Sequence, residues 1–326
     1  MLEHGGRLAR AAAHYGIPRD RWLDLSTGVS PHAWPAPAIP AEAWHRLPED
    51  EDDLLDAARA YYGCEHLLPV AGTQAAIQSL PRLRARSRIG VLAPGYAEHA
   101  HAWREAGHDV TLLPMEALVA RAGEFDVVVF ISPNNPTGER LPDAFWQLRS
   151  RASALLRKPD WVVVDEAFGD SRLDAFLQPR DGMILLRSIG KFFGMAGARA
   201  GFVAAWPALL DALREQLGPW ALSGPTRYVV ARALRDTVWQ DAMRRRLKQE
   251  STWLASTLEH AGLKPAGGTD LFQYCPHPDA AGVFEALARR GVLVRLFNEP
   301  SALRFGLPPD DVSHGYLASA LAEILP

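Results

Sequence analysis

The chain has 326 residues, about twice the length of an average domain, so it can hold two domains or one large α/β unit with an appendage. Hydrophobic residues make up 48% and charged residues 22%, and the formal net charge is −3, which excludes a disordered chain, a collagen and a coiled coil. Without an excess of Lys and Arg, a nucleic-acid partner is not expected, whereas small acidic molecules remain possible through local pockets.

Cys64 and Cys275 are the only cysteines, too few for a disulfide framework and without the spacing of a metal site. No apolar run approaches the roughly 18 residues of a membrane span, and the first residues lack the pattern of a signal peptide. We therefore expect a cytoplasmic protein with reduced thiols, no metal and no membrane partner.

The middle of the chain alternates between short apolar runs and helical stretches, which is typical of βαβ units. Three helical stretches, Thr73–Arg84, Ala97–Ala106 and Asp143–Leu156, separate strands at the spacing of crossover connections. This pattern predicts an α/β fold with a mostly parallel sheet covered by helices on both faces. The expected buried strands are Ile89–Ala93, Val110–Leu113, Val127–Ile131, Trp161–Asp165, Met183–Arg187 and Gly201–Ala204.

The pattern changes after Gly218-Pro219, where a single long helix is expected over Pro225–Ala261. Short strands and helices then predict a small α+β domain. The first 45 residues show little periodicity, and we expect extended chain there that packs near the C-terminal unit. The predicted domains are therefore 46–260 (large) and 1–45 with 261–326 (small). In the C-terminal part the expected strands are Leu271–Cys275, Val292–Phe297 and Leu303–Gly306, and the expected helices Ala280–Arg290 and Val312–Leu325.

Lys191 lies just beyond a predicted buried strand, within Arg187-Ser188-Ile189-Gly190-Lys191. Partial desolvation there would favour the neutral amine, which can form a Schiff base. Ser188 and Arg199 on either side supply the hydroxyl and guanidinium donors that bind a phosphate. From spacing alone, a surface lysine in a βα loop is the simpler interpretation.

Two further groups follow strands of the predicted sheet. Asp165 ends the strand that begins at Trp161, where open α/β sheets bind ligands, although a helix N-cap would also explain an aspartate there. The turn Ser132–Gly138 presents Asn135 at the same edge. A turn alone does not explain why these groups and Lys191 all stand at strand carboxyl ends.

Three other places carry polar groups with a possible role. Gly72-Thr73-Gln74 opens a helix whose free N–H groups can bind an anion, although an ordinary N-cap fits as well. Tyr96 could lie over a flat heteroaromatic ring, or be a half-buried tyrosine. Arg304 stands in an apolar strand and should meet a carboxylate, its own protein's or a substrate's.

Taken in order, these motifs resemble the aspartate-aminotransferase-like, fold type I enzymes that depend on pyridoxal 5′-phosphate (PLP). The resemblance covers nearly the whole chain and implies Lys191, Asp165 and Tyr96 as the catalytic residues. It implies that Arg304 binds the substrate α-carboxylate, and that the active sites lie at the interface of a homodimer. The implied cofactor-binding residues are Gly72, Thr73, Gln74, Tyr96, Asn135, Asp165, Ser188, Lys191 and Arg199.

Within this superfamily, His4-Gly5-Gly6, the segment Asp24–Pro31 and Tyr96-x-Glu98-His99 resemble the threonine-phosphate decarboxylases of cobalamin biosynthesis. The implied reaction converts L-threonine O-3-phosphate to (R)-1-aminopropan-2-ol O-phosphate and CO2. The resemblance implies substrate contacts from His4, Gly28, Asn135, Arg295 and Arg304, although His4 could equally belong to a disordered terminus.

Two positions depart from the related histidinol-phosphate aminotransferases, which carry tyrosines where this chain has Leu47 and Phe168. Both departures disfavour transamination of histidinol phosphate. An aminotransferase acting on histidinol phosphate or a related substrate remains the alternative. The reaction depends on which bond to Cα stands perpendicular to the cofactor ring, and a sequence does not show that geometry. A PLP-binding protein without catalysis is disfavoured, since binding alone would not require Lys191, Asp165, Asn135 and Arg304 together.

Overall fold

The computed structural model describes residues 5–50, 52–146, 159–172, 177–180 and 182–325. The chain divides into two compact units, which are described separately below. The small unit comprises Met1–Ala33, Pro136–Glu139 and Asp241–Pro326, and the large unit Trp34–Asn135 and Arg140–Gln240. The predicted domain limits at residues 46 and 260 stay a prediction. None of the helices in the described part of the chain is long and apolar enough to span a membrane.

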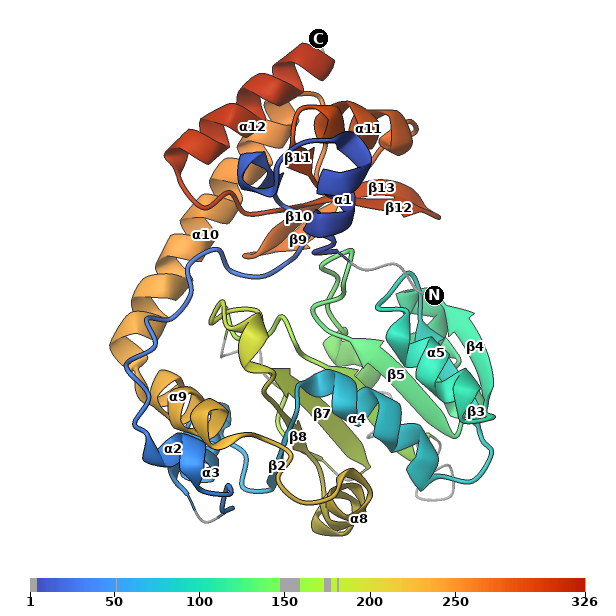
Figure 1. Ribbon diagram of the computed structural model, residues 1–326. Coiled ribbons are helices and arrows are strands. Elements are labelled where there is room, and N and C mark those ends of the chain that lie inside the picture. The colour runs from blue at the N-terminus through green and yellow to red at the C-terminus, as the bar shows by residue number, and fades with distance from the viewer. Residues whose placement is uncertain (1–4, 51, 147–158, 173–176, 181, 326) are drawn as a thin grey trace. The chain divides into compact units, whose positions relative to one another are not determined.

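The large unit is built on a seven-stranded sheet in the order β2-β8-β7-β6-β5-β3-β4 (Figure 1). Only β8 runs antiparallel to its neighbours β2 and β7, so the prediction of a mostly parallel sheet is confirmed. All six predicted strands exist, within one residue at each end. The strands are β2 (Leu67–Val70), β3 (Arg88–Leu92), β4 (Asp109–Leu113), β5 (Val127–Ile131), β6 (Trp161–Asp165), β7 (Met183–Ser188) and β8 (Gly201–Ala204).

Strand β2 was not predicted, because Pro69 interrupts its short apolar run. Its place explains why a proline is tolerated: β2 is an edge strand, paired with β8 on one side only.

Both faces of this sheet are covered, since every residue of β5, β6 and β7 is buried. One face packs against α4 (Thr73–Ser79), α5 (Glu98–Glu105) and α8 (Pro207–Leu217) in a single apolar cluster. The opposite face meets Tyr62 of α3 (Asp53–Tyr62), whose ring lies 5.6 Å from that of Phe202. The prediction of helices on both faces is confirmed.

Short helical segments complete the large unit. The helix predicted over 143–156 is helical at residues 143–146, and the rest of it falls outside the described residues. The additional segments are α2 (Glu42–His45), α6 (Met115–Ala120) and the 3₁₀ turns η2 (Leu80–Leu83), η3 (Ala122–Glu124) and η5 (Ala196–Ala198).

The single long helix predicted over 225–261 is wrong: the chain forms α9 (Gly224–Arg235) and α10 (Thr237–His260) with a break at Asp236. Asp236 leaves the helical conformation, with φ −84° and ψ 74°. Its carboxylate accepts hydrogen bonds from the Trp239 backbone N–H and from Trp34 Nε1, both at 3.0 Å. The aspartate therefore caps the start of α10. The helical periodicity of the sequence continues from α9 into α10 and concealed the break.

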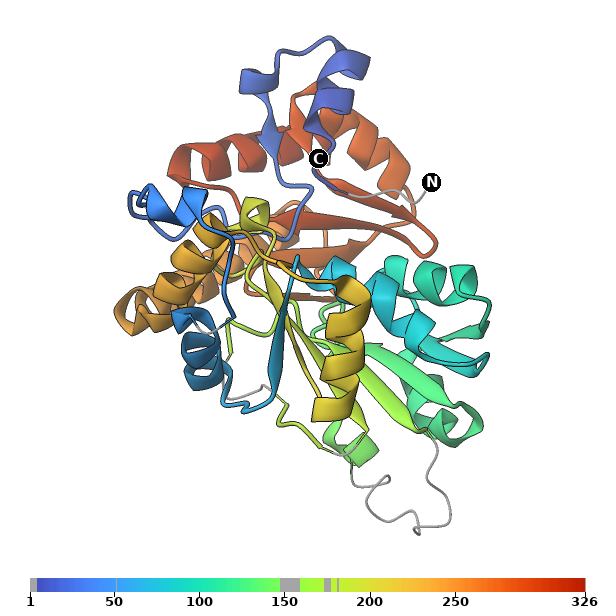
Figure 2. The same ribbon diagram turned by 60° about the horizontal axis from the view of Figure 1, so that its bottom comes forward.

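The small unit contains a four-stranded antiparallel sheet in the order β12-β13-β10-β9. Helices α11 and α12 lie on the same side of this sheet in both views (Figures 1 and 2), which confirms the predicted α+β character. The elements are β9 (Gly267–Thr269), β10 (Phe272–Pro276), α11 (Ala280–Arg289), β12 (Arg295–Asn298), β13 (Ser301–Gly306) and α12 (Asp311–Ile324).

The strand predicted over Val292–Phe297 is divided between two sheets. Its first part, β11 (Val292–Leu293), pairs in parallel with β1 (Leu23–Asp24), and its second part is β12. This pairing joins the N-terminal segment to the C-terminal part of the chain, as predicted.

The expectation that this N-terminal segment is only extended chain is wrong. Residues Leu8–Tyr15 form helix α1, followed by the 3₁₀ turn η1 (Arg19–Arg21). Alanine, the best helix former, occupies four of the eight positions of α1, and Gly16 ends the helix with a left-handed φ of 67°.

Candidate active site

One pocket in the large unit brings together all nine residues predicted to bind the cofactor. It lies where β5, β6 and β7 end, and has a volume of about 140 Å³. Residues from five different connections meet there, although they are spread over more than 120 positions of the sequence. The predicted residues that line it are Gly72, Thr73, Gln74, Tyr96, Asn135, Asp165, Ser188, Lys191 and Arg199.

Asp165 is the buried acid of this pocket, with 3% of its surface exposed. Its Oδ2 lies 3.0 Å from Nε2 of His99, a side chain only 1% exposed, in the first turn of α5. Its Oδ1 accepts a hydrogen bond from the Ala167 backbone N–H at 3.0 Å. These bonds fix the orientation of the carboxylate and offset the cost of burying it.

Tyr96 stands at the side of the pocket in a chain of polar contacts. Its hydroxyl donates to Oε1 of Gln74 at 3.1 Å, and Nε2 of Gln74 donates to Oε2 of Glu98 at 2.9 Å. Burial, followed by the negative charges of Glu98 and Asp165, raises the pKa of Tyr96 to about 12. Tyr96 therefore stays a neutral phenol at physiological pH, with its ring orientation fixed by Gln74.

The pocket is also lined by donors suited to a phosphate. Gly72 has a φ of +74°, and a Cβ there would lie 2.7 Å from Nη2 of Arg199. Arg199 itself adopts the left-handed conformation and donates from Nη1 to the Ala196 carbonyl oxygen at 3.2 Å. The Ser188 hydroxyl and the first N–H groups of α4, at Thr73, line the same pocket. Hydroxyl, guanidinium and helix N–H groups are the donors that an anion requires.

Lys191 lies half-buried in the turn after β7, with Nζ 5.4 Å from the centre of the Phe168 ring. The turn is held by Ser188, whose hydroxyl oxygen accepts from the Gly190 N–H at 3.2 Å. Asn135 lines the same pocket, and its neighbour Asn134 anchors the turn by donating to the Pro94 carbonyl oxygen at 2.8 Å. A primary amine, an amide and a buried carboxylate thus share one enclosed space.

A buried ion pair lies behind the strand ends. Glu166 Oε2 is 2.8 Å from Nη1 of Arg187, and both side chains are almost completely buried. Burial raises the pKa of Glu166, and the charge of Arg187 opposes that rise. Removing one partner alone would leave an uncompensated buried charge, so this pair fixes the relative positions of β6 and β7 beneath the pocket.

The remaining predicted substrate residues belong to the small unit. Arg304 is 5% exposed, and its Nη2 donates to the Ser26 carbonyl oxygen at 2.9 Å. Arg295 is its partner in register across β12 and β13, and burial together with the charge of Arg295 lowers the pKa of Arg304. Gly28 is buried in the loop after β1, and His4 lies outside the described residues.

His99 is the main residue that the sequence reasoning did not assign. The motif Tyr96-x-x-His99 contained a signal, since the spacing places both side chains at the start of one helix. Their rings lie 6.2 Å apart and nearly perpendicular. The strand order β6-β5-β3, together with the packing of α5 against β3 and β4, brings the histidine to Asp165.

The chain matches the family model of aminotransferase class I and II over residues 43–321. It therefore belongs to the aminotransferase class I and II family. It is 49% identical to a threonine-phosphate decarboxylase of Pseudomonas aeruginosa, over 98% of this chain and 97% of that protein. It is 40% identical to a threonine-phosphate decarboxylase of a Sinorhizobium species, over 99% of this chain and 98% of that protein.

The fold is also that of known structures in this family. The histidinol-phosphate aminotransferase from Sinorhizobium meliloti, solved in complex with pyridoxal-5′-phosphate, superposes with a TM-score of 0.82. The match covers 99% of this chain and 95% of that one at 19% sequence identity, so it bears on the fold alone.

Proposed function

We propose that this chain is a PLP-dependent enzyme that decarboxylates L-threonine O-3-phosphate to (R)-1-aminopropan-2-ol O-phosphate and CO2. The observation that carries the proposal is the meeting of Lys191, Asp165 and the anion-binding group in one pocket of a chain 49% identical to a threonine-phosphate decarboxylase. The place of this reaction in cobalamin biosynthesis follows from the resemblance of the motifs.

The residues of the pocket fit PLP in their chemistry. Gly72 leaves the space beside Arg199 open, which a Cβ would fill, and that space adjoins Ser188 and Thr73, the donors for a phosphate. Asp165 is a buried carboxylate that can pair with a protonated pyridine nitrogen, and Asn135 offers an amide to a ring oxygen. Lys191 would hold the cofactor through its amine, and Tyr96 would cover its ring.

When bound there, PLP supplies an electron sink for the pair of electrons left when a bond to the substrate Cα breaks. Asp165, oriented by His99, would hold its carboxylate against the ring nitrogen. The Lys191 amine would carry protons at this site, and it would supply the proton that replaces the departing carboxylate at Cα.

The substrate has two anionic groups that need partners. We assign its α-carboxylate to Arg304, whose guanidinium is already fixed by the Ser26 carbonyl and can bind a carboxylate in a bidentate manner. We assign its phosphate to Arg295, Gly28 and His4, as the resemblance of the motifs implies.

A homodimer, with active sites at its interface, is part of the proposal. In the large unit, the large apolar side chains of Trp44, Leu47 and Trp220 are 64%, 65% and 58% exposed in the single chain. Light scattering should give twice the chain mass. Trp44→Glu should lower that mass, and a chain that is monomeric at micromolar concentration would refute the dimer.

The predicted division into a large cofactor domain, 46–260, and a small domain from both chain ends is retained as part of the proposal. A cytoplasmic location is retained as well, in keeping with Cys64 and Cys275, which are both free and buried.

The test uses the cofactor-loaded protein and carboxyl-labelled L-threonine O-3-phosphate, with Lys191→Ala as the blank and Lys264→Ala as a control lysine variant. The proposal is supported if the native protein and Lys264→Ala release labelled CO2 and Lys191→Ala does not. No release, with the cofactor converted to its amine form by an amino donor, would refute it in favour of an aminotransferase.

A further inference from the structure

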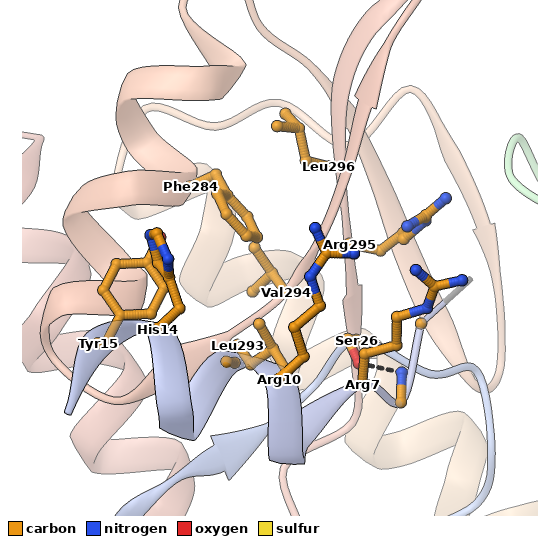
Figure 3. A pocket seen from close by; sticks show the side chains of 13 residues that line it. Arg7, Arg10, His14, Tyr15, Ser26, Phe284, Leu293, Val294, Arg295 and Leu296 are labelled. Atoms are coloured by element: carbon orange, nitrogen blue, oxygen red, sulfur yellow. Dashed lines mark hydrogen bonds between the residues drawn. The ribbon is translucent and has the colours of Figure 1, made fainter. Parts of the chain in front are cut away.

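The small unit holds a further pocket of about 350 Å³, between α1, α11 and β12 (Figure 3). Ser26 and Arg295 line it, and both belong to the substrate site proposed above, where Arg304 donates to the Ser26 carbonyl. The large unit contains a buried charged group without such an assignment. It is the ion pair of Glu166 and Arg187, to which neither the sequence motifs nor the proposed reaction gives a role.

This ion pair has more partners than the two strands that it joins. Backbone hydrogen bonds already align β6 with β7, and the Glu166 N–H donates to the Leu186 carbonyl oxygen at 2.9 Å. Apolar side chains of similar volume often stabilise a fold as well as a buried ion pair does. Two buried charges at this place therefore indicate polar groups that need them as partners.

The polar groups are those of the Leu177 backbone. Oε1 of Glu166 accepts a hydrogen bond from the Leu177 N–H at 3.1 Å, and Nη2 of Arg187 donates to the Leu177 carbonyl oxygen at 2.8 Å. Oε2 of Glu166 lies 2.8 Å from Nη1 of Arg187, so the three residues form one closed network. Because hydrogen bonds from and to charged groups are strong, this network fixes Leu177 beside Glu166.

The chain makes two turns directly after β6. The Gly169 N–H donates to the Glu166 carbonyl oxygen at 2.8 Å, and the Arg172 N–H donates to the Gly169 carbonyl oxygen at 3.0 Å. The network of Glu166, Arg187 and Leu177 therefore holds the chain on both sides of these turns.

The first of these turns carries two residues of the cofactor pocket. The Ala167 N–H donates to Oδ1 of Asp165 at 3.0 Å, and the centre of the Phe168 ring lies 5.4 Å from Nζ of Lys191. Phe168 is buried, and Ala167 and Phe168 both line the pocket. The turn thus contacts both the buried acid and the amine that would hold the cofactor.

The ion pair is closed to solvent. The side chain of Arg187 is 0% exposed and that of Glu166 is 2% exposed. Burial raises the pKa of Glu166 to about 7, and the charge of Arg187 opposes this rise. The buried carboxylate of Asp170 adds to the rise. A single substitution would leave a charge uncompensated here, so an informative variant replaces Glu166 and Arg187 together.

We propose that Glu166 and Arg187 are positioning residues for the cofactor. By binding Leu177 they hold the turn after β6 in place, and this turn orients the Asp165 carboxylate toward the ring nitrogen and packs against Lys191. The inference rests on the proposed function for the roles of Asp165 and Lys191. It extends that function to two residues that act on the cofactor only through the turn.

The test is a titration of the full chain with PLP, followed by visible absorbance without substrate. Glu166→Leu with Arg187→Met removes both charges together and both contacts to Leu177. The Kd for PLP should rise about 10-fold, which corresponds to the loss of one hydrogen bond to a charged group. The band of the ring-protonated cofactor should be lost at a lower pH than in the native chain, because a poorly oriented Asp165 stabilises the protonated nitrogen less.

A second double variant, Glu166→Gln with Arg187→Met, keeps one of the two contacts. The amide oxygen at position 166 can still accept from the Leu177 N–H, so the Kd for PLP should rise only about threefold. This variant also keeps a polar side chain near Asp170, and it provides the test if the first double variant does not fold.

The control is an ion pair at the opposite end of β6. Nη2 of Arg84 donates to Oδ2 of Asp160 at 2.7 Å, and neither residue lines the cofactor pocket. Arg84→Met with Asp160→Asn should lower the melting temperature while leaving the PLP affinity and the absorbance spectrum unchanged. The melting temperature of each variant verifies that it is folded during the titration.

The inference is overturned if either double variant of Glu166 and Arg187 is folded and binds PLP within about twofold of the native chain. It is equally overturned if the control pair changes the Kd or the spectrum as much. The titration contains no substrate, so a native chain that binds PLP as expected but releases no CO2 would overturn the proposed reaction alone.

Discussion

The contact between His99 and Asp165 gives the sharpest prediction about the active site. His99→Leu removes the imidazole whose Nε2 lies 3.0 Å from the carboxylate and leaves the buried Asp165 carboxylate with the hydrogen bond from the Ala167 N–H. A hydrogen bond to a charged group contributes about 1.5–3 kcal/mol, which corresponds to roughly a 10- to 100-fold change in an equilibrium constant. We therefore expect cofactor affinity and kcat to fall within that range.

The matched control is His108→Leu, which removes another buried histidine of the same unit. His108 contacts the Pro81 carbonyl oxygen at 2.8 Å and accepts from the Ser87 N–H at 3.1 Å, but it does not line the pocket. It should lower the melting temperature without changing the absorbance spectrum of the bound cofactor. His99→Gln, which can still donate to the carboxylate, should restore part of the affinity.

The assay is a cofactor titration followed by visible absorbance over a range of pH, at a temperature where each variant is folded. In His99→Leu the band of the ring-protonated cofactor should be lost at a lower pH than in the native protein. The reasoning is refuted if His99→Leu binds the cofactor within twofold of the native chain. It is equally refuted if His108→Leu shifts the spectrum as much.

Three other changes test separate parts of the structure. Gly72→Ala places a Cβ 2.7 Å from Nη2 of Arg199 at a φ of +74°. It should destabilise the fold by about 1–3 kcal/mol and weaken cofactor binding. The control Gly197→Ala, at a glycine with open space around it, should do neither. Arg304→Gln should raise the KM for the substrate roughly 30-fold or more while leaving the Ki of (R)-1-aminopropan-2-ol O-phosphate, which has no carboxylate, within threefold of native. Burial raises the pKa of the Cys64 thiol and raises that of the Cys275 thiol to about 12. Neither thiol should therefore react with a disulfide reagent at pH 8 until the chain unfolds. Rapid modification of the native protein would contradict this prediction.

Sequence patterns predicted six of the seven strands of the large sheet and the polar groups that follow them. Runs such as Val127–Ile131 and Trp161–Asp165 are apolar at almost every position, a pattern that fits strands buried on both faces. Because the carboxyl ends of parallel strands meet at one edge, the ordered positions of Asn135, Asp165 and Lys191 along the chain indicated a shared pocket.

Local patterns were insufficient where a side chain competes with the backbone. The periodicity across Asp236 continues from α9 into α10, and only its carboxylate, capping Trp239, ends the first helix. In the same way, an edge position of the sheet made Pro69 acceptable within β2, which no local rule could reveal.

Which distant residues meet depends on the tertiary fold. His99 reaches Asp165 across 66 positions because α5 packs against β3 and β4 and the sheet has the order β6-β5-β3-β4, and Arg10 and Arg295 line one pocket because β1 pairs with β11. Propensity and periodicity describe each residue's own segment. Contacts of this kind depend instead on strand order and helix packing, which the whole chain sets at once through the burial of its apolar surface.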